Sequence, residues 1–337
     1  MPADRNSPRL VLAGASSLLG GEIKSLLEES RFAGWDLVLV DEDEVAGTLT
    51  EARGEAALIQ RVEVDTFRGA RFALLAGSSA FSKKCIAPAH EAGAAVIDFS
   101  YAVLSDPDAV PWFPRIEALI SKSLPKHAKT FCVISAGGAA VSRLALLLRK
   151  FGLQRLVATL NQPVSDSGRA GIEELETQTS QLLSFQATGS PVFGTQTAFN
   201  VLSRYGAESR HDLQRRSLET RAEISAAVGD PSEDAKISLN LLHVPVFYGI
   251  TFALCADLQS KVLAENLSAA LRDAGFQVAT KDESAPSNIS VAGESDLYLA
   301  QPGPELSREN TWWFLGAADN LHFAAASGLK LAESLDS

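Results

Sequence analysis

The first hundred residues alternate short apolar runs with amphipathic segments, and this alternation constrains the fold more than any other feature of the chain. Runs typical of buried strands occupy residues 10–13, 37–40, 70–77 and 94–100. Between them, residues 22–27 and 82–93 carry apolar side chains at helical spacing. Strands that alternate with helices predict an α/β fold with a parallel sheet covered by helices on both faces.

The pattern changes after about residue 128, where apolar runs become longer and the strands no longer alternate regularly with helices. The sequence predicts strands at the start of 131–152, over 156–165 and within 236–258, the last broken at Pro245 and Gly249. It predicts helices in the rest of 131–152 and over 168–185, 209–224, 261–274 and 319–335. The length of 337 residues fits about two domains.

Charge and cysteine usage exclude several classes of protein. A net charge of −11 would repel a phosphate backbone, so we expect no nucleic-acid partner. No apolar run reaches the roughly 18 residues that a bilayer span needs, and no signal peptide is evident, so we expect a cytoplasmic protein without a membrane partner. Three scattered cysteines, Cys85, Cys132 and Cys255, fit neither a disulfide framework nor a zinc site, and we expect no metal.

A turn of small residues, Gly14 to Gly21, lies directly after the first predicted strand and before the first helix. Unpaired amides at such a helix start favour a pyrophosphate. Asp41 ends the next strand, at about the position where a carboxylate binds a ribose hydroxyl and disfavours a 2′-phosphate. The spacing is not the strict G-x-G-x-x-G, so a tight turn with a solvated Asp41 is the alternative. We expect NAD to be slightly favoured over NADP.

Several segments resemble aspartate-semialdehyde dehydrogenase in order and spacing over nearly the whole chain. The most specific are QPVSDSGRAGIEEL (162–175), HVPVFYG (243–249) and ADNL (318–321). The resemblance is closest to the Usg-type paralogues of that family. It implies a Rossmann-like dinucleotide-binding domain, a central α+β dimerisation domain with a mostly antiparallel sheet, and a C-terminal helix that returns to the first domain. The corresponding boundaries are residues 1–130, 131–317 and 318–337.

The resemblance also implies a covalent reaction, which this sequence does not support. In the family a cysteine thiolate attacks the aldehyde, hydride passes to NADP, and phosphate releases the acyl group. The cysteine lies in an N-P-N-C-[ST] turn, which here reads AGGAA (136–140), so Ala139 occupies its position. The orienting glutamine is retained as Gln162, but His243 stands where the substrate arginine belongs and Ile250 where the catalytic histidine belongs.

Further family positions have also changed. Leu104 matches a phosphate-binding arginine, and D-L-Q-R (212–215) replaces the E-E-x-K motif. Loss of nucleophile and base together typically costs roughly 10⁴–10⁶ in rate, so we predict no catalytic residue with confidence. In the last helix Asp319 and Asn320 remain, whereas His322 and Phe323 replace two cations that help to hold the cofactor. The cofactor residues we expect are Gly14, Ser16, Ser17, Leu18, Leu19, Gly20, Asp41, Gly77 and Asn320.

Other candidate groups have ordinary structural explanations. His243 could be a new acid or base, and Ser135, Ser142, Ser165 or Ser167 could be nucleophiles activated by it, but a hydrogen-bonded structural histidine is the simpler interpretation. The basic run 210–221 is interleaved with acids and predicts a solvated helix face, with anion binding as the alternative. The aromatic cluster Trp312 to Phe314 predicts a core or interface strand.

The sequence therefore predicts a homodimeric aspartate-semialdehyde dehydrogenase homologue without dehydrogenase activity. It leaves two outcomes for the cofactor: NAD or NADP still binds, or this binding has been lost. One alternative is an active NAD(P)-dependent oxidoreductase that acts on a different small molecule by direct hydride transfer. The other is a structural partner subunit of a true dehydrogenase.

Overall fold

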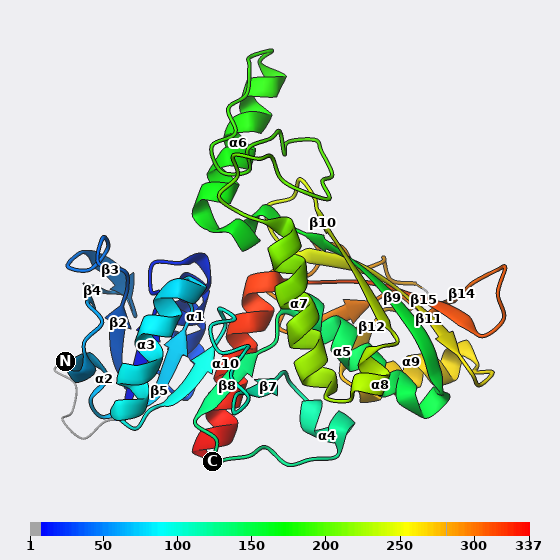
Figure 1. The fold of residues 1–337 in the computed structure, drawn as a ribbon, viewed down its shortest axis with the longest axis horizontal. Coiled ribbons are helices and arrows are strands. Elements are labelled where there is room, and N and C mark those ends of the chain that lie inside the picture. The colour runs from blue at the N-terminus through cyan, green and yellow to red at the C-terminus, as the bar shows by residue number, and fades with distance from the viewer. Residues whose placement is uncertain (1–7, 281) are drawn as a thin grey trace. The chain divides into compact units, whose positions relative to one another are not determined.

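The computed structural model describes residues 8–280 and 282–337 (Figure 1). The chain divides into two compact units. Unit 1 comprises Met1–Pro114, Ser123–Ile134 and Ala324–Ser337, and unit 2 comprises Arg115–Lys122 and Ser135–Phe323. The boundaries expected from the sequence, at residues 130 and 317, stay a prediction.

Unit 1 is built on an eight-stranded sheet with the strand order β3-β4-β2-β1-β5-β6-β8-β7. The strands are β1 (Arg9–Ala13), β2 (Asp36–Val40), β3 (Leu49–Ala52), β4 (Glu55–Gln60), β5 (Ala70–Leu75), β6 (Ala95–Asp98), β7 (Val110–Trp112) and β8 (Thr130–Val133). All neighbours pair in parallel except β3 and β4, which form an antiparallel hairpin. The predicted parallel sheet is confirmed, whereas the sequence pattern gave no sign of this hairpin.

Serine side chains cap two of the helices of unit 1. The helices of this unit are α1 (Leu18–Glu29), α2 (Val64–Phe67), α3 (Ser79–Glu91) and the last part of α10 (Asn320–Asp336). Ser17 and Ser78 accept hydrogen bonds from backbone amides of the first turns of α1 and α3. Asp336, near the end of α10, forms ion pairs with Arg31 and Arg71. The expected return of the C-terminal helix to the first domain is confirmed.

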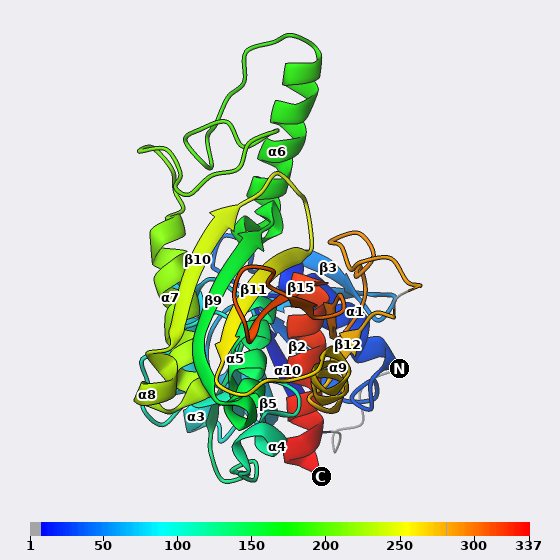
Figure 2. The ribbon, with the colours of Figure 1, turned by 90° about the vertical axis from the view of Figure 1, so that its right-hand side faces the viewer.

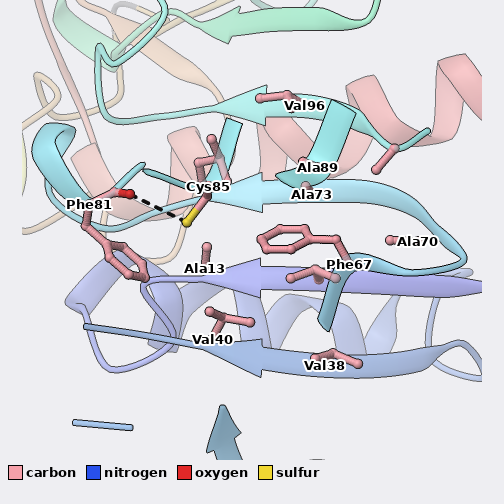
Figure 3. Close-up of a cluster of buried hydrophobic side chains, with 13 residues drawn as sticks. Ala13, Val38, Val40, Phe67, Ala70, Ala73, Phe81, Cys85, Ala89 and Val96 are labelled. Carbon is pink, nitrogen blue, oxygen red and sulfur yellow. Dashed lines mark hydrogen bonds between the residues drawn. The ribbon is translucent and has the colours of Figure 1, made fainter. Parts of the chain in front are cut away.

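A buried apolar cluster joins α2 and α3 to one face of this sheet (Figure 3). Alternate residues of the strands, such as Val38 and Val40 of β2, point into it together with Phe67, Phe81 and Cys85 of the helices. The Cys85 thiol lies 3.5 Å from the carbonyl oxygen of Phe81, so this cysteine is a core residue.

Unit 2 contains a seven-stranded sheet with the order β10-β9-β11-β15-β13-β12, in which β14 also pairs with β15. The strands are β9 (Leu153–Gln162), β10 (Ile237–His243), β11 (Ile250–Leu258), β12 (Phe276–Val278), β13 (Leu297–Leu299), β14 (Gly303–Pro304) and β15 (Thr311–Ala318). β9–β10 and β12–β13 are parallel, and the other four pairs are antiparallel. The expected α+β architecture with a mostly antiparallel sheet is confirmed.

Helices cover one face of this second sheet, as the side view shows (Figure 2). The helical segments of unit 2 are α4 (Ile116–Ile120), α5 (Ala136–Leu148), η1 (Arg149–Phe151), η2 (Val164–Ser167), α6 (Gly168–Leu183), α7 (Leu213–Val228), α8 (Pro231–Asp234), α9 (Ala264–Asp273) and the start of α10. Every residue of α5 is buried, because the helix packs on β9 and β11 and is covered by α7. The helix predicted over 209–224 begins only at Leu213, after its cap Asp212.

The opposite face of the same sheet carries partly exposed side chains. Trp313 and Leu315 of β15 are 39% and 50% exposed, while Trp312 and Phe314 between them are buried. Thr251, Ala253 and Cys255 of β11 alternate in the same way with buried neighbours.

Among the described residues, no helix combines the length and apolar character needed to cross a bilayer.

Candidate functional site

The glycine turn of unit 1 owes its glycines to close packing of backbone. Gly14 has a φ of +86°, and a Cβ atom there would lie 2.2 Å from the nitrogen of Gly77, in the turn that follows β5. A Cβ atom on Gly20 would lie 2.2 Å from the carbonyl oxygen of Gly14. Three of the predicted cofactor residues are therefore glycines because two turns meet here, with or without a ligand.

The start of α1 has the donors that a phosphate needs. Ser17 Oγ accepts a hydrogen bond from the amide of Gly20 at 2.8 Å and donates one to the carbonyl of Ala76 at 2.9 Å. Within the described ranges 8–280 and 282–337, the amides of Leu18 and Leu19 have no acceptor. Free amides in the first turn of a helix favour an anion, so this turn fits the pyrophosphate of a dinucleotide.

Asp41 is bound to the same turn. Its Oδ2 accepts a hydrogen bond from the amide of Ser16 at 2.7 Å, and its Oδ1 accepts one from the amide of Glu42 at 2.9 Å. The side chain is buried, with only 5% of the residue exposed. The structure thus brings Asp41 to the glycine turn, as predicted, but the carboxylate binds the chain's own backbone. An acidic group here opposes a further phosphate at this position.

In unit 2, the first turn of α5 corresponds to the nucleophile turn of the resemblance. Ser135 caps the helix, because its Oγ accepts a hydrogen bond from the amide of Gly138 at 3.1 Å. Glu223 of α7 binds the same serine: Oε2 accepts from its amide at 2.9 Å, and Oε1 lies 2.5 Å from its Oγ. Glu223 could not be predicted from the sequence, because nothing in its local pattern distinguishes it from the charged residues around it.

Close contact between Glu223 and α5 explains the absence of a side chain at Gly138. A Cβ atom on Gly138 would lie 2.4 Å from Oε1 of Glu223. Glu223 is fully buried, and burial raises its pKa to about 7, although the bonds from Ser135 act in the opposite direction. Ala139, the next residue, is also fully buried and presents only a methyl group. No thiol or hydroxyl group lies at this position.

Gln162 lies on the sheet face that carries the first turn of α5. A Cβ atom on Gly137 would touch Leu160 and Ile250 at 2.9 Å, and these residues are the neighbours of Gln162 along β9 and across to β11. Gln162 is only 4% exposed, and its Oε1 has no hydrogen-bond partner among the described residues. Ile250 therefore lies beside the first turn of α5, and Gln162 is two residues from Leu160, the other neighbour of that turn.

His243 pairs with Gln162 in the register of β10 with β9. The imidazole is fully buried, its Nδ1 lies 3.0 Å from the hydroxyl of Tyr205, and the rings of Phe193 and Tyr205 pack against it. Burial lowers the pKa of His243 to about 4, so the side chain is neutral at pH 7. A neutral imidazole cannot hold a carboxylate as an arginine would.

A second polar cluster of unit 2 surrounds Asp166. Asn320 donates a hydrogen bond from Nδ2 to Asp166 Oδ1 at 2.7 Å and accepts one from the amide of Gly249 at 3.0 Å. Arg216 Nη2 lies 3.7 Å from Asp166 Oδ2. Burial raises the pKa of Asp166, while Arg216 opposes the shift. Asn320, a predicted cofactor residue, is thus engaged with protein groups. Arg216 belongs to the basic run 210–221, for which a solvated helix face was predicted, and it is half-buried beside Asp166.

The remaining candidates take no part in the hydrogen bonds described above. Asp212 caps α7, and Arg215 pairs with Glu219 on the exposed side of that helix, so D-L-Q-R contributes surface and capping groups. Leu104 lies in a turn of unit 1. Phe323 is buried, and the His322 amide donates to Asp319.

The serine hypothesis is corrected in one respect. The hydrogen-bond partner of Ser135 is Glu223 and not His243. Ser142 is fully buried, Ser165 Oγ contacts Asn320, and Ser167 precedes α6. Among residues 8–280 and 282–337, no group of three or more histidine, cysteine or acidic side chains could hold a metal ion.

Comparison with known proteins places these features in context. Residues 9–122 match a family model described as semialdehyde dehydrogenase, NAD binding domain, and residues 144–323 match one described as semialdehyde dehydrogenase, dimerisation domain. The chain is 26% identical over 337 residues to a USG-1 protein homolog of Azotobacter vinelandii, which covers 97% of both chains. It is 26% identical over 334 residues to the aspartate-semialdehyde dehydrogenase of Rickettsia bellii, again over 97% of both.

Solved structures share the fold. A probable aspartate-semialdehyde dehydrogenase from Pseudomonas aeruginosa superimposes with a TM-score of 0.84 at 22% identity, which covers 98% of this chain and 99% of the other.

Proposed function

The chain belongs to the semialdehyde dehydrogenase family, and on that premise we propose that it is a member without the cysteine-dependent dehydrogenase reaction. The start of α5 carries this proposal. Where the family resemblance places the nucleophile, the chain has a buried methyl group, Ala139, next to a helix start closed by Ser135 and Glu223. A methyl group cannot form the thioester on which the covalent route depends.

Two further features support the loss of this reaction. Ile250 cannot transfer a proton, and His243 is held neutral against Tyr205 and Phe193. The groups that should activate the nucleophile and hold an anionic substrate are therefore absent together. A small-molecule ligand that used this region would meet uncharged groups at Gln162 and His243.

The dinucleotide turn supports retained binding of NAD. Leu18 and Leu19 would hold the pyrophosphate through their amides, with Ser17 beside them, and a bound nicotinamide would supply hydride chemistry. Asp41 and Glu42 place negative charge near the turn, which disfavours a 2′-phosphate. We therefore propose NAD over NADP as the nucleotide that this unit accepts.

The exposed sheet face of unit 2 supports a homodimer. An apolar surface lies in the region that matches the dimerisation model, and it is formed by Trp313, Leu315, Ala253 and Cys255.

We also propose a cytoplasmic location, supported by the absence of any disulfide among Cys85, Cys132 and Cys255.

A binding experiment combined with one substitution tests the proposal. NAD should raise the melting temperature of the purified protein more than NADP does. The Ala139→Cys variant should bind NAD equally well and still oxidise no aspartate semialdehyde, because Ile250 and His243 remain. Turnover by this variant would show that the missing thiol alone accounts for the loss, whereas cysteine-dependent turnover by the unsubstituted chain would overturn the proposal. Turnover by the unsubstituted chain, independent of its cysteines, would favour direct hydride transfer instead, and co-purification with a second dehydrogenase would favour the partner-subunit alternative.

A further inference from the structure

Glu223 makes a contact that the proposed function does not use. Its carboxyl group comes from α7 and accepts hydrogen bonds from the backbone amide and the hydroxyl of Ser135. We infer that Glu223 is a proton-responsive lock on the first turn of α5: a carboxyl group that holds this turn in both protonation states. The gain or loss of one proton reverses the direction of its hydrogen bond with the Ser135 hydroxyl. This inference does not depend on whether the chain is an enzyme.

The geometry is that of a capping box whose acid comes from another helix. In a capping box the N-cap serine accepts from the third amide of the helix, and an acidic side chain at that third position accepts from the serine amide. Here Ser135 accepts from the amide of Gly138, but glycine has no side chain to return the bond. Glu223 provides the missing carboxylate, and its Oε1 fills the space beside Gly138. The first turn of α5 is thus fixed by α7.

Two protonation states satisfy this arrangement. When Glu223 is ionised, the Ser135 hydroxyl donates to Oε1, and Oε2 accepts from the Ser135 amide. When Glu223 gains a proton on Oε1, that O–H donates to Ser135 Oγ, and the serine hydroxyl hydrogen rotates away from Oε1. The heavy atoms stay in place, and no covalent bond other than the carboxyl O–H forms or breaks.

The charged groups around Glu223 balance the two states. Arg216 lies on the same helix and favours the ionised carboxylate, whereas Asp166 of η2 favours the protonated form. On the side of α5, the contacts are the uncharged groups of Ser135 and Gly138. Burial is the largest effect and raises the pKa of Glu223 to about 7, so both forms are populated near neutral pH.

Isotope-edited NMR of the glutamate side-chain carboxyl carbons in the full-length protein tests the lock directly. We expect one buried resonance, absent from Glu223→Gln, to titrate with a midpoint near pH 7. Ser135→Ala removes a hydroxyl whose hydrogen bond is stronger to the charged carboxylate than to the protonated carboxyl group, so the midpoint should rise by about one pH unit. Glu219→Gln, on the exposed side of α7, is the matched control and should leave this midpoint unchanged.

Stability measurements provide a second readout. A carboxyl group whose pKa is raised on folding binds its proton more tightly in the folded state, so its contribution to stability falls as pH rises from about 4.5 to about 7. The unfolding constant of the unsubstituted chain should therefore increase by up to about tenfold per pH unit relative to Glu223→Gln across that range. A midpoint near 4.5, or one that Ser135→Ala does not move, would overturn the inference even if Glu223→Gln failed to fold.

Discussion

The carboxylate of Asp41 accepts a hydrogen bond from the amide of Ser16 at 2.7 Å, within the turn that should bind a dinucleotide. This contact places a negative charge and an occupied donor at the turn. We predict that Asp41→Ala raises the affinity for NADP by about tenfold, because it frees the Ser16 amide and removes repulsion of the 2′-phosphate. The affinity for NAD should change less. Calorimetric titration with both nucleotides checks this.

Asp36→Ala is the matched control for that experiment. Asp36 is the first residue of β2, the strand that ends just before Asp41, and it pairs with Arg9 instead of the turn. Equal gains in NADP affinity in both variants would show that general charge, and not the Asp41 contact, governs nucleotide choice.

A substitution at Gly138 tests the packing of Glu223 on α5. The Cβ atom of Gly138→Ala would lie 2.4 Å from Glu223 Oε1, and the buried carboxyl group has little room to move. We predict a loss of about 1–3 kcal/mol in the free energy of unfolding, measured by urea denaturation.

Gly21→Ala offers the opposite expectation. Gly21 lies inside α1, where a Cβ atom would meet nothing within 4 Å. The free energy of unfolding of this control should rise by about 0.5–1 kcal/mol, because alanine has a higher helix propensity than glycine. A neutral Gly138→Ala would contradict the close contact.

The burial of His243 predicts that the stability of the folded protein depends on pH. Its pKa is lowered to about 4 in the folded state, so the unfolded chain binds a proton more readily. The stability that this group confers is complete above about pH 6.5 and is lost as the pH falls towards 4. Between about pH 6.5 and 4, His243→Gln should lose up to about 3 kcal/mol less of its free energy of unfolding than the parent does.

The measurement is the difference in unfolding free energy between variant and parent at each pH, which separates His243 from the opposite trend of Glu223. His127→Gln changes an exposed histidine and should reproduce the parent profile. A His243→Gln profile parallel to the parent would mean that the imidazole is not held neutral.

The sheet face of unit 2 that carries Trp313 and Leu315 predicts how a charged side chain there affects self-association. Leu315 is 50% exposed on β15, and a glutamate there would have to be buried in a dimer formed through this face. We predict that Leu315→Glu raises the dimer dissociation constant by tenfold or more, measured by analytical ultracentrifugation. Leu58→Glu, at a similarly exposed position of unit 1, should have no effect.

Periodicity in the sequence was sufficient for most of the fold. The parallel sheet of unit 1 follows from repeated buried strands such as residues 37–40, and the mostly antiparallel sheet of unit 2 followed from the family resemblance. The hairpin β3–β4 was missed because its strands, Leu49–Ala52 and Glu55–Gln60, are largely exposed and lack a continuous apolar run. The start of α7 was placed too early because Asp212 acts as a cap and not as a helical residue.

The site was less accessible to prediction, because its contacts join distant parts of the chain. The resemblance assigned Ala139, Gln162 and Ile250 to one site, and in the structure the first turn of α5 packs against Ile250 and against Leu160 of β9. No local pattern pairs Ser135 with Glu223, which are 88 residues apart. The binding of Asp41 to the turn, in place of a free carboxylate, likewise depends on tertiary packing.

The central claim is that the chain does not carry out cysteine-dependent aldehyde oxidation, and an activity assay tests it most directly. The purified protein is mixed with aspartate semialdehyde, phosphate and either NAD or NADP, and formation of the reduced nucleotide is followed by absorbance. The aspartate-semialdehyde dehydrogenase of Rickettsia bellii serves as the positive control. The account predicts no reduction above the protein-free rate with either nucleotide. Phosphate-dependent turnover that is lost when Cys132 is replaced would contradict it.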